Sequence, residues 1–317
     1  MLIKTQIHKF IELSVVIPIY NEEQNIALLY HRLKNVLVTL RKTHEIILVD
    51  DGSKDDSLKE MLRLREQDDK VHIIKFRRNF GQTAALDAGF KQAKGNIIIT
   101  MDGDLQNDPV DIPLLLEKIY TGYDVVSGWR YNRRDNISKR LFSRMAHFLR
   151  KFIIKERIHD AGCMLKAYKK ECVHNINLYG EMHRYIPALL ALKGFKITEV
   201  KVQHHKRKYG KTKYNALRLP RGFFDLLFIK FWNDYSTRPL HFFGFMALGQ
   251  YVLSLLILVE QIIKAIVINS LTAGPLLLLC AILIITGTLT FLFGFLAEIM
   301  IRMYYRDNEN YSIEKIY

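Results

Sequence analysis

The chain has 317 residues, of which 49% are hydrophobic and 25% are charged, the balance of a folded protein rather than a disordered one. Its formal net charge is +15. The whole excess lies in residues 130–157 and 206–238, which hold ten and nine Lys or Arg respectively, against two acidic residues each. Because the rest of the chain is balanced, these counts argue against binding of nucleic acid. They predict two basic patches for anionic lipid headgroups or for phosphate.

The cysteines Cys163, Cys172 and Cys280 show no CxxC or Cys/His metal spacing, and their odd number argues against a disulfide framework. A reducing compartment is consistent with this. The first apolar stretch, residues 13–19, is short, contains Pro18 and lacks a small-residue cleavage site. We therefore expect a first β-strand there and not a secretory signal.

Short runs rich in Val and Ile alternate with helical stretches in the first part of the chain. These runs are residues 13–17, 45–49, 72–76, 96–101 and 124–128. Strands that lack polar alternation are covered on both faces, so this order predicts βα units in a mostly parallel sheet. The expected fold class is α/β, of the Rossmann-like type.

Polar residues follow each of these five runs, where α/β proteins bind their ligands. They are residues 20–22, 50–53, 77–79, 102–104 and 129–130. Because parallel strands bring their carboxyl ends to one edge of a sheet, we expect the five clusters to line one crevice.

Asp102 and Asp104 are two residues apart after the fourth run, so in an extended segment both carboxylates point the same way. Hard oxygen ligands on one face suit Mg²⁺ or Mn²⁺ bridging to a diphosphate, and the amide oxygen of Gln106 extends the set by a further step of two. A solvated turn or a helix start is the alternative. The place of the pair at the end of a buried strand favours the metal site.

Residues 50–53 (DDGS) have two interpretations. A turn followed by a helix N-cap explains the composition, and a carboxylate there could also accept hydrogen bonds from a nucleobase or a ribose. The chain contains neither G-x-G-x-x-G nor G-x-x-x-x-G-K-[ST]. A bound diphosphate would therefore be met by a metal and by Arg or Lys side chains.

Two basic segments, residues 138–154 and 214–232, place apolar side chains at helical spacing among Lys and Arg. Both are predicted to be amphipathic helices, and the second is expected to lie in the membrane interface. A helix packed against its own domain is the alternative.

Two long runs without charged residues follow, at 240–259 and 273–297. Each can span a bilayer as a helix, and the thirteen residues between them are too few for a domain, so a transmembrane hairpin is predicted. Core helices of a soluble domain are the alternative, but residues 273–297 lack the polar stripe that such helices keep. The loop between the runs has only Lys264, whereas a basic stretch precedes the first run, so the soluble part is expected to face the cytoplasm.

The expected organisation has four parts. They are a cytoplasmic catalytic domain (1–212), interfacial helices (213–238), two transmembrane helices within 239–301 (about 240–262 and 273–299) and a cytoplasmic tail (302–317).

A set of motifs runs in order along most of the chain. They are residues 16–23 (VIPIYNEE), 50–53 (DDGS), 78–81 (RNFG), 101–106 (MDGDLQ), 160–168 (DAGCMLKAY), 204–205 (HH) and 207–214 (RKYGKTKY). Together they resemble family 2 glycosyltransferases of the polyprenyl-phosphate type. These include undecaprenyl-phosphate 4-deoxy-4-formamido-L-arabinose transferases, undecaprenyl-phosphate glucosyltransferases and dolichyl-phosphate mannosyltransferases.

The resemblance implies a GT-A fold and the inverting transfer of a sugar from a nucleotide donor, with uridine diphosphate favoured, to a polyprenyl phosphate such as undecaprenyl phosphate. It also implies Mg²⁺ or Mn²⁺, contact with membrane lipid, a place in the inner membrane and a homotetramer. The product would be a polyprenyl-monophosphoryl sugar for glycan or lipid A modification.

The resemblance also assigns roles to residues. The nucleoside would be held by Pro18, Tyr20, Glu22, one of Asp50 and Asp51, and Asp102. The metal would be bound by Asp104 and Gln106, with Asp102 nearer the nucleotide. Acceptor phosphate and diphosphate would be bound by Arg130, Lys139, Ser143, Arg207 and Lys213. The catalytic residues would be Asp102, Asp104 and Asp160, where Asp160 orients the acceptor or acts as a base, with a structural role at a turn as the alternative.

Three other functions fit the sequence less well. Phosphatases that form an aspartyl phosphate place their two-aspartate motif at the first strand, not the fourth. Processive polysaccharide synthases need a longer membrane channel and a Gln-x-x-Arg-Trp-type motif, which was not found. A non-enzymatic scaffold on the membrane surface would use the basic patches alone.

Overall fold

The computed structural model divides into two compact units, residues 1–227 and 228–317, and each is described by itself. The structure describes residues 10–131, 158–174, 176, 178, 180, 182–207, 227, 230–231, 234–235, 238–268 and 274–306.

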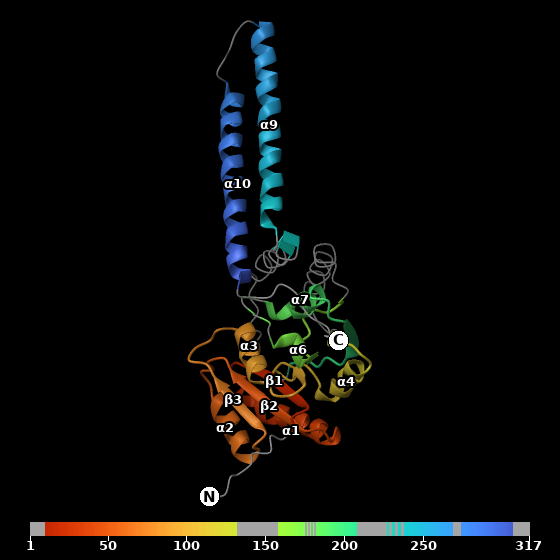
Figure 1. The fold of residues 1–317 in the computed structure, drawn as a ribbon. Coiled ribbons are helices and arrows are strands. Elements are labelled where there is room, and N and C mark those ends of the chain that lie inside the picture. The colour runs from red at the N-terminus through yellow and green to blue at the C-terminus, as the bar shows by residue number, and fades with distance from the viewer. Residues whose placement is uncertain are drawn as a thin grey trace, which may run out of the picture. The chain divides into compact units, whose positions relative to one another are not determined.

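The first unit is built on a seven-stranded sheet in the order β3-β2-β1-β4-β6-β5-β7. Strands β1, β2 and β3 lie side by side in Figure 1. The strands are β1 (Leu13–Ile19), β2 (His44–Asp50), β3 (Val71–Lys75), β4 (Ile97–Thr100), β5 (Val125–Arg130), β6 (Lys166–Lys169) and β7 (Ile197–Val202). All neighbouring strands are parallel except at β6, which pairs antiparallel with both β4 and β5. The sheet is therefore mixed and mostly parallel, as expected for the α/β fold.

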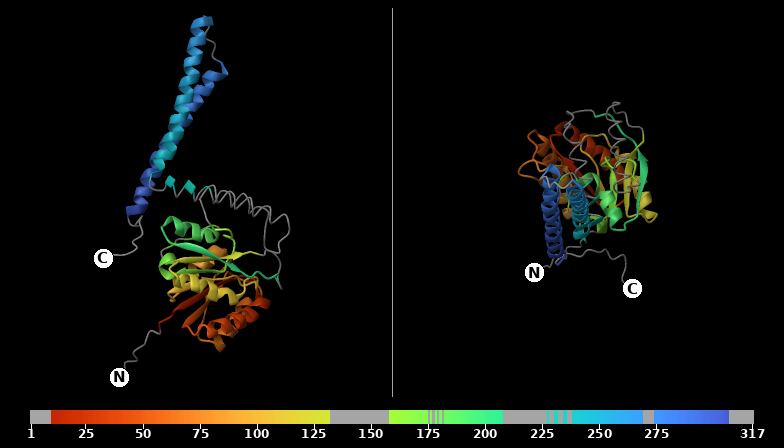
Figure 2. Two further views of the ribbon diagram at one scale, coloured as in Figure 1. Left: turned by 90° about the vertical axis from the view of Figure 1, so that its right-hand side faces the viewer. Right: turned by 90° about the horizontal axis from the view of Figure 1, so that it is seen from above.

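Helices cover both faces of this sheet (Figure 2). One face packs against α1 (Glu23–Thr39), α2 (Ser57–Gln67), the short 3₁₀ helix η1 (Pro109–Asp111) and α4 (Ile112–Tyr120). The other face packs against α3 (Gln82–Gln92), α6 (Lys170–Val173), the 3₁₀ helix η2 (Met182–Arg184) and α7 (Ile186–Leu192). Coverage on both sides explains why β1 and β2 are buried along almost their whole length and are apolar in their central residues.

The five strands predicted from the sequence are confirmed as β1 to β5, with ends that differ by at most two residues. The strands β6 and β7 were not predicted. Because β6 inserts between β4 and β5, the carboxyl end of β5 is one strand further from the other four than a purely sequential sheet would place it.

Gly52 sets the turn after β2. Its φ is +70°, and a Cβ built on it would lie 2.4 Å from the carbonyl carbon of Arg78. A side chain is therefore excluded by backbone conformation and by space together, and this close approach brings residues 78–81 against the end of β2.

The second unit contains two long helices, α9 (Pro239–Ile268) and α10 (Pro275–Arg306), which pack against each other. The Tyr251 hydroxyl lies 3.0 Å from Thr288 Oγ1, and Ser254 Oγ donates to the carbonyl oxygen of Cys280 at 3.2 Å. Both helices are long and apolar enough to cross a membrane and expose many large apolar side chains, so they fit the expected hairpin. Each helix is longer than the transmembrane segment predicted for it.

Candidate active site

The loops after β1 and β2 are joined by hydrogen bonds at the carboxyl edge of the sheet. Asn21 N donates to Ser53 Oγ at 3.0 Å, and Lys54 N donates to the Asn21 side chain at 2.7 Å. Asn21 has a φ of 52°, a left-handed conformation that Asn tolerates better than most residues. The two loops, which carry the predicted nucleoside-binding residues, therefore form one surface.

The Asp51 carboxylate holds the segment that follows β3. It accepts hydrogen bonds from the backbone nitrogens of Phe80 (2.7 Å) and Gly81 (3.0 Å) and from Asn79 Nδ2 (2.9 Å). Burial raises the pKa of Asp51, while the two backbone donors lower it. Asp50 is buried completely and accepts from Ser53 N, whereas Asp51 keeps 4% of its surface exposed. Both residues are therefore buried, and of the two carboxylates that of Asp50 has an oxygen, Oδ2, without a hydrogen-bond partner among the described residues.

The other predicted nucleoside residues lie on the neighbouring strand and loop. Pro18 is half-buried in β1, and Tyr20 follows that strand. Glu22 is buried, and its carboxylate accepts from Asn25 Nδ2 at 2.6 Å. Gly103 lies against this strand, because a Cβ there would be 2.6 Å from Ile19 Cδ1 and 3.4 Å from the carbonyl oxygen of Pro18. The loop after β4 that carries the predicted metal ligands (residues 101–108, the metal loop) therefore packs directly against β1, which leads into the predicted nucleoside-binding residues.

Asp102 and Asp104 follow β4, where Asp104 is buried and Asp102 is half-buried. Burial and, second, the Asp104 charge raise the pKa of Asp102 to about 7. Gln82 Nε2 donates to Asp102 Oδ1 at 2.7 Å, and Gln106 N donates to Asp104 Oδ1 at 3.1 Å. Leu105, between Asp104 and Gln106, has a φ of 62°, a strained conformation for a branched apolar residue.

The side-chain oxygens of Asp102, Asp104 and Gln106 are of the kind that binds Mg²⁺ or Mn²⁺. The Asp104 charge contributes to the raised pKa of Asp102, and a nearby divalent cation would stabilise both carboxylates. The Gln106 side chain makes no hydrogen bond among the described residues. In the part of the chain that the structure describes, no three His, Cys, Asp or Glu residues are grouped to hold a metal ion. A cation here would therefore complete its shell with substrate oxygens and water.

Residues 203–207 run alongside the metal loop after β7. His205 N donates to the carbonyl oxygen of Gln106 at 2.9 Å, and His205 Nε2 lies 2.8 Å from Asp108 Oδ2. Arg207 Nη2 donates to Asp104 Oδ2 at 2.5 Å. The predicted phosphate-binding residue Arg207 is thus ion-paired with a predicted metal ligand.

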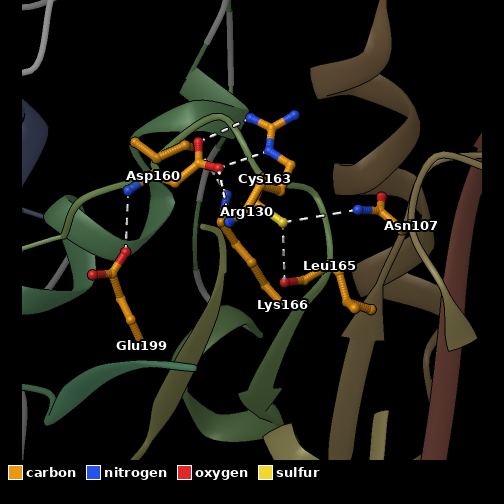
Figure 3. Close-up of polar contacts among 8 residues, drawn as sticks. Asn107, Arg130, Asp160, Cys163, Leu165, Lys166 and Glu199 are labelled. Carbon is orange, nitrogen blue, oxygen red and sulfur yellow. Dashed lines mark hydrogen bonds and ion pairs between the residues drawn. The ribbon is translucent and has the colours of Figure 1, made fainter. Parts of the chain in front are cut away.

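Arg130 and Asp160 form a buried, two-pronged ion pair (Figure 3). Arg130 Nε donates to Asp160 Oδ2 at 2.6 Å and Nη2 donates to Oδ1 at 2.9 Å. Burial alone would lower the pKa of the Arg130 guanidinium, but the Asp160 carboxylate more than offsets this and raises it. Glu199 on β7 accepts from the backbone nitrogens of His159 and Asp160 and fixes the turn.

Cys163 and Lys166 support this turn from inside the sheet (Figure 3). Burial raises the pKa of the Cys163 thiol to about 11, so it stays neutral and is not a nucleophile at neutral pH. Lys166 is completely buried, and its Nζ donates to the carbonyl oxygen of Ala161 at 3.1 Å. Both side chains are therefore structural parts of the 160–166 segment.

The structure thus brings together most of the predicted site. Asp102, Asp104 and Gln106 lie in one loop with Arg207 beside it, and the loops of Tyr20 and Asp51 adjoin each other. Lys139, Ser143 and Lys213 lie outside the described residues, as does the whole amphipathic helix predicted at 138–154. Of the one predicted at 214–232, only residues 227, 230 and 231 are described. Three residues of the site were not predicted from the sequence: Gln82, Asn107 and Glu199. Gln82 contacts Asp102, Asn107 contacts Cys163, and Glu199 contacts Asp160. These contacts join segments far apart in the chain or follow no motif.

Comparisons with known proteins find relatives that match nearly the whole chain. The model of glycosyl transferase family 2 matches residues 14–176. Dodecaprenyl-phosphate galacturonate synthase of Rhizobium johnstonii is 39% identical over 315 residues, covering 97% of this chain and 93% of the relative. Undecaprenyl-phosphate 4-deoxy-4-formamido-L-arabinose transferase of Pseudomonas fluorescens is 34% identical over 308 residues, covering 96% and 89%.

A solved structure shows the same fold. Glucosyl-3-phosphoglycerate synthase from Mycobacterium tuberculosis, in complex with Mn²⁺, uridine diphosphate and glucosyl-3-phosphoglycerate, superposes with a TM-score of 0.54 at 16% identity. The match covers 69% of this chain and 79% of that one. The likeness confirms the predicted GT-A-like fold.

Proposed function

Because the chain belongs to glycosyl transferase family 2, we propose that it transfers a sugar from a uridine-diphosphate donor onto the phosphate of a polyprenyl phosphate such as undecaprenyl phosphate. One observation carries the proposal. The Asp102/Asp104 pair follows β4 beside the nucleoside loops, in a chain whose relatives over nearly its whole length are polyprenyl-phosphate sugar transferases.

The nucleotide is assigned to the edge formed by β1, β2 and β4. Pro18, Tyr20 and Glu22 hold the nucleoside together with one of Asp50 and Asp51, both of which are buried at the end of β2. Asp102 lies nearest the nucleotide diphosphate. The phosphate roles of Arg130, Lys139, Ser143, Arg207 and Lys213 belong to the same proposal.

Asp104 and Gln106, with Asp102, would hold Mg²⁺ or Mn²⁺. When bound, the ion would supply positive charge that stabilises the departing nucleotide diphosphate. The solved structure of the Mycobacterium synthase with Mn²⁺ and uridine diphosphate supports this choice of ion and leaving group.

The acceptor needs no strong general base. A phosphate monoester has a second pKa of about 6, so at neutral pH it is largely dianionic and already nucleophilic. A phosphate oxygen attacks the anomeric carbon, the bond from that carbon to the diphosphate breaks, and the configuration inverts. Asp160, which Arg130 engages through both oxygens, is assigned to positioning and not to proton transfer.

The acceptor lipid places the reaction at a membrane. The parts of α9 and α10 within 239–301 form the transmembrane hairpin, and residues 213–238 lie in the interface of the inner membrane. Residues 1–212 and the tail 302–317, which includes the end of α10, lie on the cytoplasmic side. The product is a polyprenyl-monophosphoryl sugar for glycan or lipid A modification. A homotetramer is part of the proposal, and light scattering of the purified protein in detergent tests it.

A panel of donors tests the substrate assignment. The purified chain is incubated with Mn²⁺, undecaprenyl phosphate and the uridine diphosphate derivatives of galacturonate, 4-deoxy-4-formamido-arabinose or glucose. The lipid product is then weighed by mass spectrometry. We expect one donor to give a sugar phosphodiester of the lipid, and galacturonate is the first choice because of the 39% identical relative. Transfer to soluble 3-phosphoglycerate and not to the lipid would contradict the acceptor assignment.

A further inference from the structure

Residues 203–205, which precede Arg207, form hydrogen bonds with the metal loop and with η1. Gln203 N donates to Asp111 Oδ2 at 2.7 Å, and His204 forms an antiparallel bridge with Asn107. His205 contacts both Gln106 and Asp108. The position of Arg207 is therefore set by the fold of the loop and not only by its long, flexible side chain.

Arg207 forms a hydrogen bond to a carboxylate oxygen of Asp104 that a bound cation would use as a ligand. Its Nη2 donates to Asp104 Oδ2 at 2.5 Å, while Asp104 Oδ1 already accepts from Gln106 N. The side chains of Arg207 and Asp104 are only 22% and 8% exposed, so water screens the pair weakly. Both oxygens of this carboxylate are engaged by the protein itself.

A space beside the pair can receive the guanidinium. A groove of about 650 Å³ is lined by Arg207, Lys206, Arg32 and Leu105, among others. Among the described residues of this lining Asp108 is the one carboxylate, and it is bound by His205, so the described lining is net positive. An anionic ligand entering it would attract Arg207 away from Asp104.

We propose that Arg207 competes with the divalent cation for Asp104. In the metal-free chain the guanidinium occupies Oδ2. When cation and donor bind, Arg207 leaves this oxygen and its charge becomes available to the phosphates of the substrates. Arg207 is thus a positioning residue that couples the metal site to the phosphates, an inference that rests on the proposed function, in which Asp104 holds the metal.

Binding of Mn²⁺ alone, without nucleotide, tests the competition. The affinity of the full chain in detergent is measured by electron paramagnetic resonance for the wild type and for R207Q. A hydrogen bond to a charged group is strong enough that its removal changes an equilibrium by about tenfold or more, so R207Q is expected to bind Mn²⁺ about tenfold more tightly. R207K keeps the charge but loses the planar fork, and an increase of about threefold is expected.

The matched control is K34Q, which also removes one positive charge. Lys34 pairs with Asp68 and has no contact with the metal loop among the described residues, so its Mn²⁺ affinity should stay that of the wild type. A folded R207Q protein, with unchanged thermal unfolding, that binds Mn²⁺ no more tightly than K34Q would overturn the proposal. If R207Q fails to fold, the Mn²⁺ affinity of R207K is compared with that of K34Q in its place, and equal affinities would overturn the proposal.

The variant D104N separates this inference from the proposed function. Loss of Mn²⁺ binding in D104N, with no gain in R207Q, would refute the competition and leave the metal site standing. Full Mn²⁺ binding by D104N would refute the metal assignment of Asp104, and the competition with it.

Discussion

The Asp160 carboxylate is held by both ends of the Arg130 guanidinium, with Nε 2.6 Å from Oδ2 and Nη2 2.9 Å from Oδ1. The Arg130 backbone nitrogen donates to Oδ2 as well, at 3.3 Å. A carboxylate committed in this way is poorly placed to accept a proton from a substrate. The pair therefore fixes the turn at residues 160–163 against the end of β5.

The variant D160N is expected to destabilise the protein, because it leaves the Arg130 charge buried without its partner. Breaking a buried ion pair on one side typically costs about 3–5 kcal/mol, and urea unfolding of the protein in detergent measures it. The control is D87N, which removes an exposed pair with Lys91 and should change stability by less than about 1 kcal/mol. Wild-type stability of D160N with a lost pH dependence of the rate would instead identify Asp160 as a base.

The variant G52A tests the close contact between the turn after β2 and Arg78. A control, G122A, has a similar positive φ of +100° but no atom within 4 Å of the added Cβ. G122A should cost about 1–2 kcal/mol from its backbone conformation, and G52A at least about 2 kcal/mol more from the collision. Equal losses of unfolding free energy in the two variants would show that the contact with Arg78 does not constrain this turn.

His183 is expected to make stability fall in mild acid. Burial, followed by the charges of Arg184 and Lys166, lowers the pKa of this imidazole to about 3, and its Nδ1 lies 2.7 Å from Thr83 Oγ1. The unfolded chain takes up a proton on this residue below about pH 6.5, while the folded chain does not until about pH 3. The stability contributed by neutral His183 is therefore present above pH 6.5 and is lost as the pH falls towards 3.

Because of His183, the free energy of unfolding is expected to fall by about 1.4 kcal/mol for each pH unit below 6.5. Between pH 6.5 and pH 5, the wild type should lose about 2 kcal/mol more unfolding free energy than H183Q. Parallel pH profiles for the two proteins would show that His183 is protonated in the folded state in this range.

Much of the fold could be predicted because its strands and helices follow from local patterns of apolar residues in the sequence. The continuous apolar runs of β1 and β2 need cover on both faces, and that requirement alone implies a layered, mostly parallel sheet. β6 escaped prediction because it has only four residues, begins with a lysine and owes its place to pairing with β4 and β5. The burial of Lys166 inside that strand has no local signal at all.

The site was predicted in its parts more than in its connections. The spacing of Asp102, Asp104 and Gln106 is a local feature, and the structure keeps the three in one loop. The ion pair of Asp104 with Arg207 spans 103 positions in the chain, and no periodicity or spacing encodes such a contact. The same holds for Gln82, which reaches Asp102 from the first residue of α3.

Gln82 is expected to position Asp102 for the donor. Without its hydrogen bond, Q82A should lower kcat/KM for the donor by about tenfold, which corresponds to one hydrogen bond to a charged group. Its matched control is Q92A, at the opposite end of the same helix, which should leave the steady-state kinetics unchanged. Wild-type kcat/KM in Q82A would show that Asp102 is held by other contacts.

The most direct test of the account is sugar transfer by the variant D104A in membranes supplied with undecaprenyl phosphate, the donor identified from the panel, and Mn²⁺. We predict that the wild type forms the lipid-linked sugar and stops when the metal is chelated, whereas D104A forms none although it still sediments with the membranes. Transfer by D104A at the wild-type rate would contradict the assignment of the active site to the loop after β4.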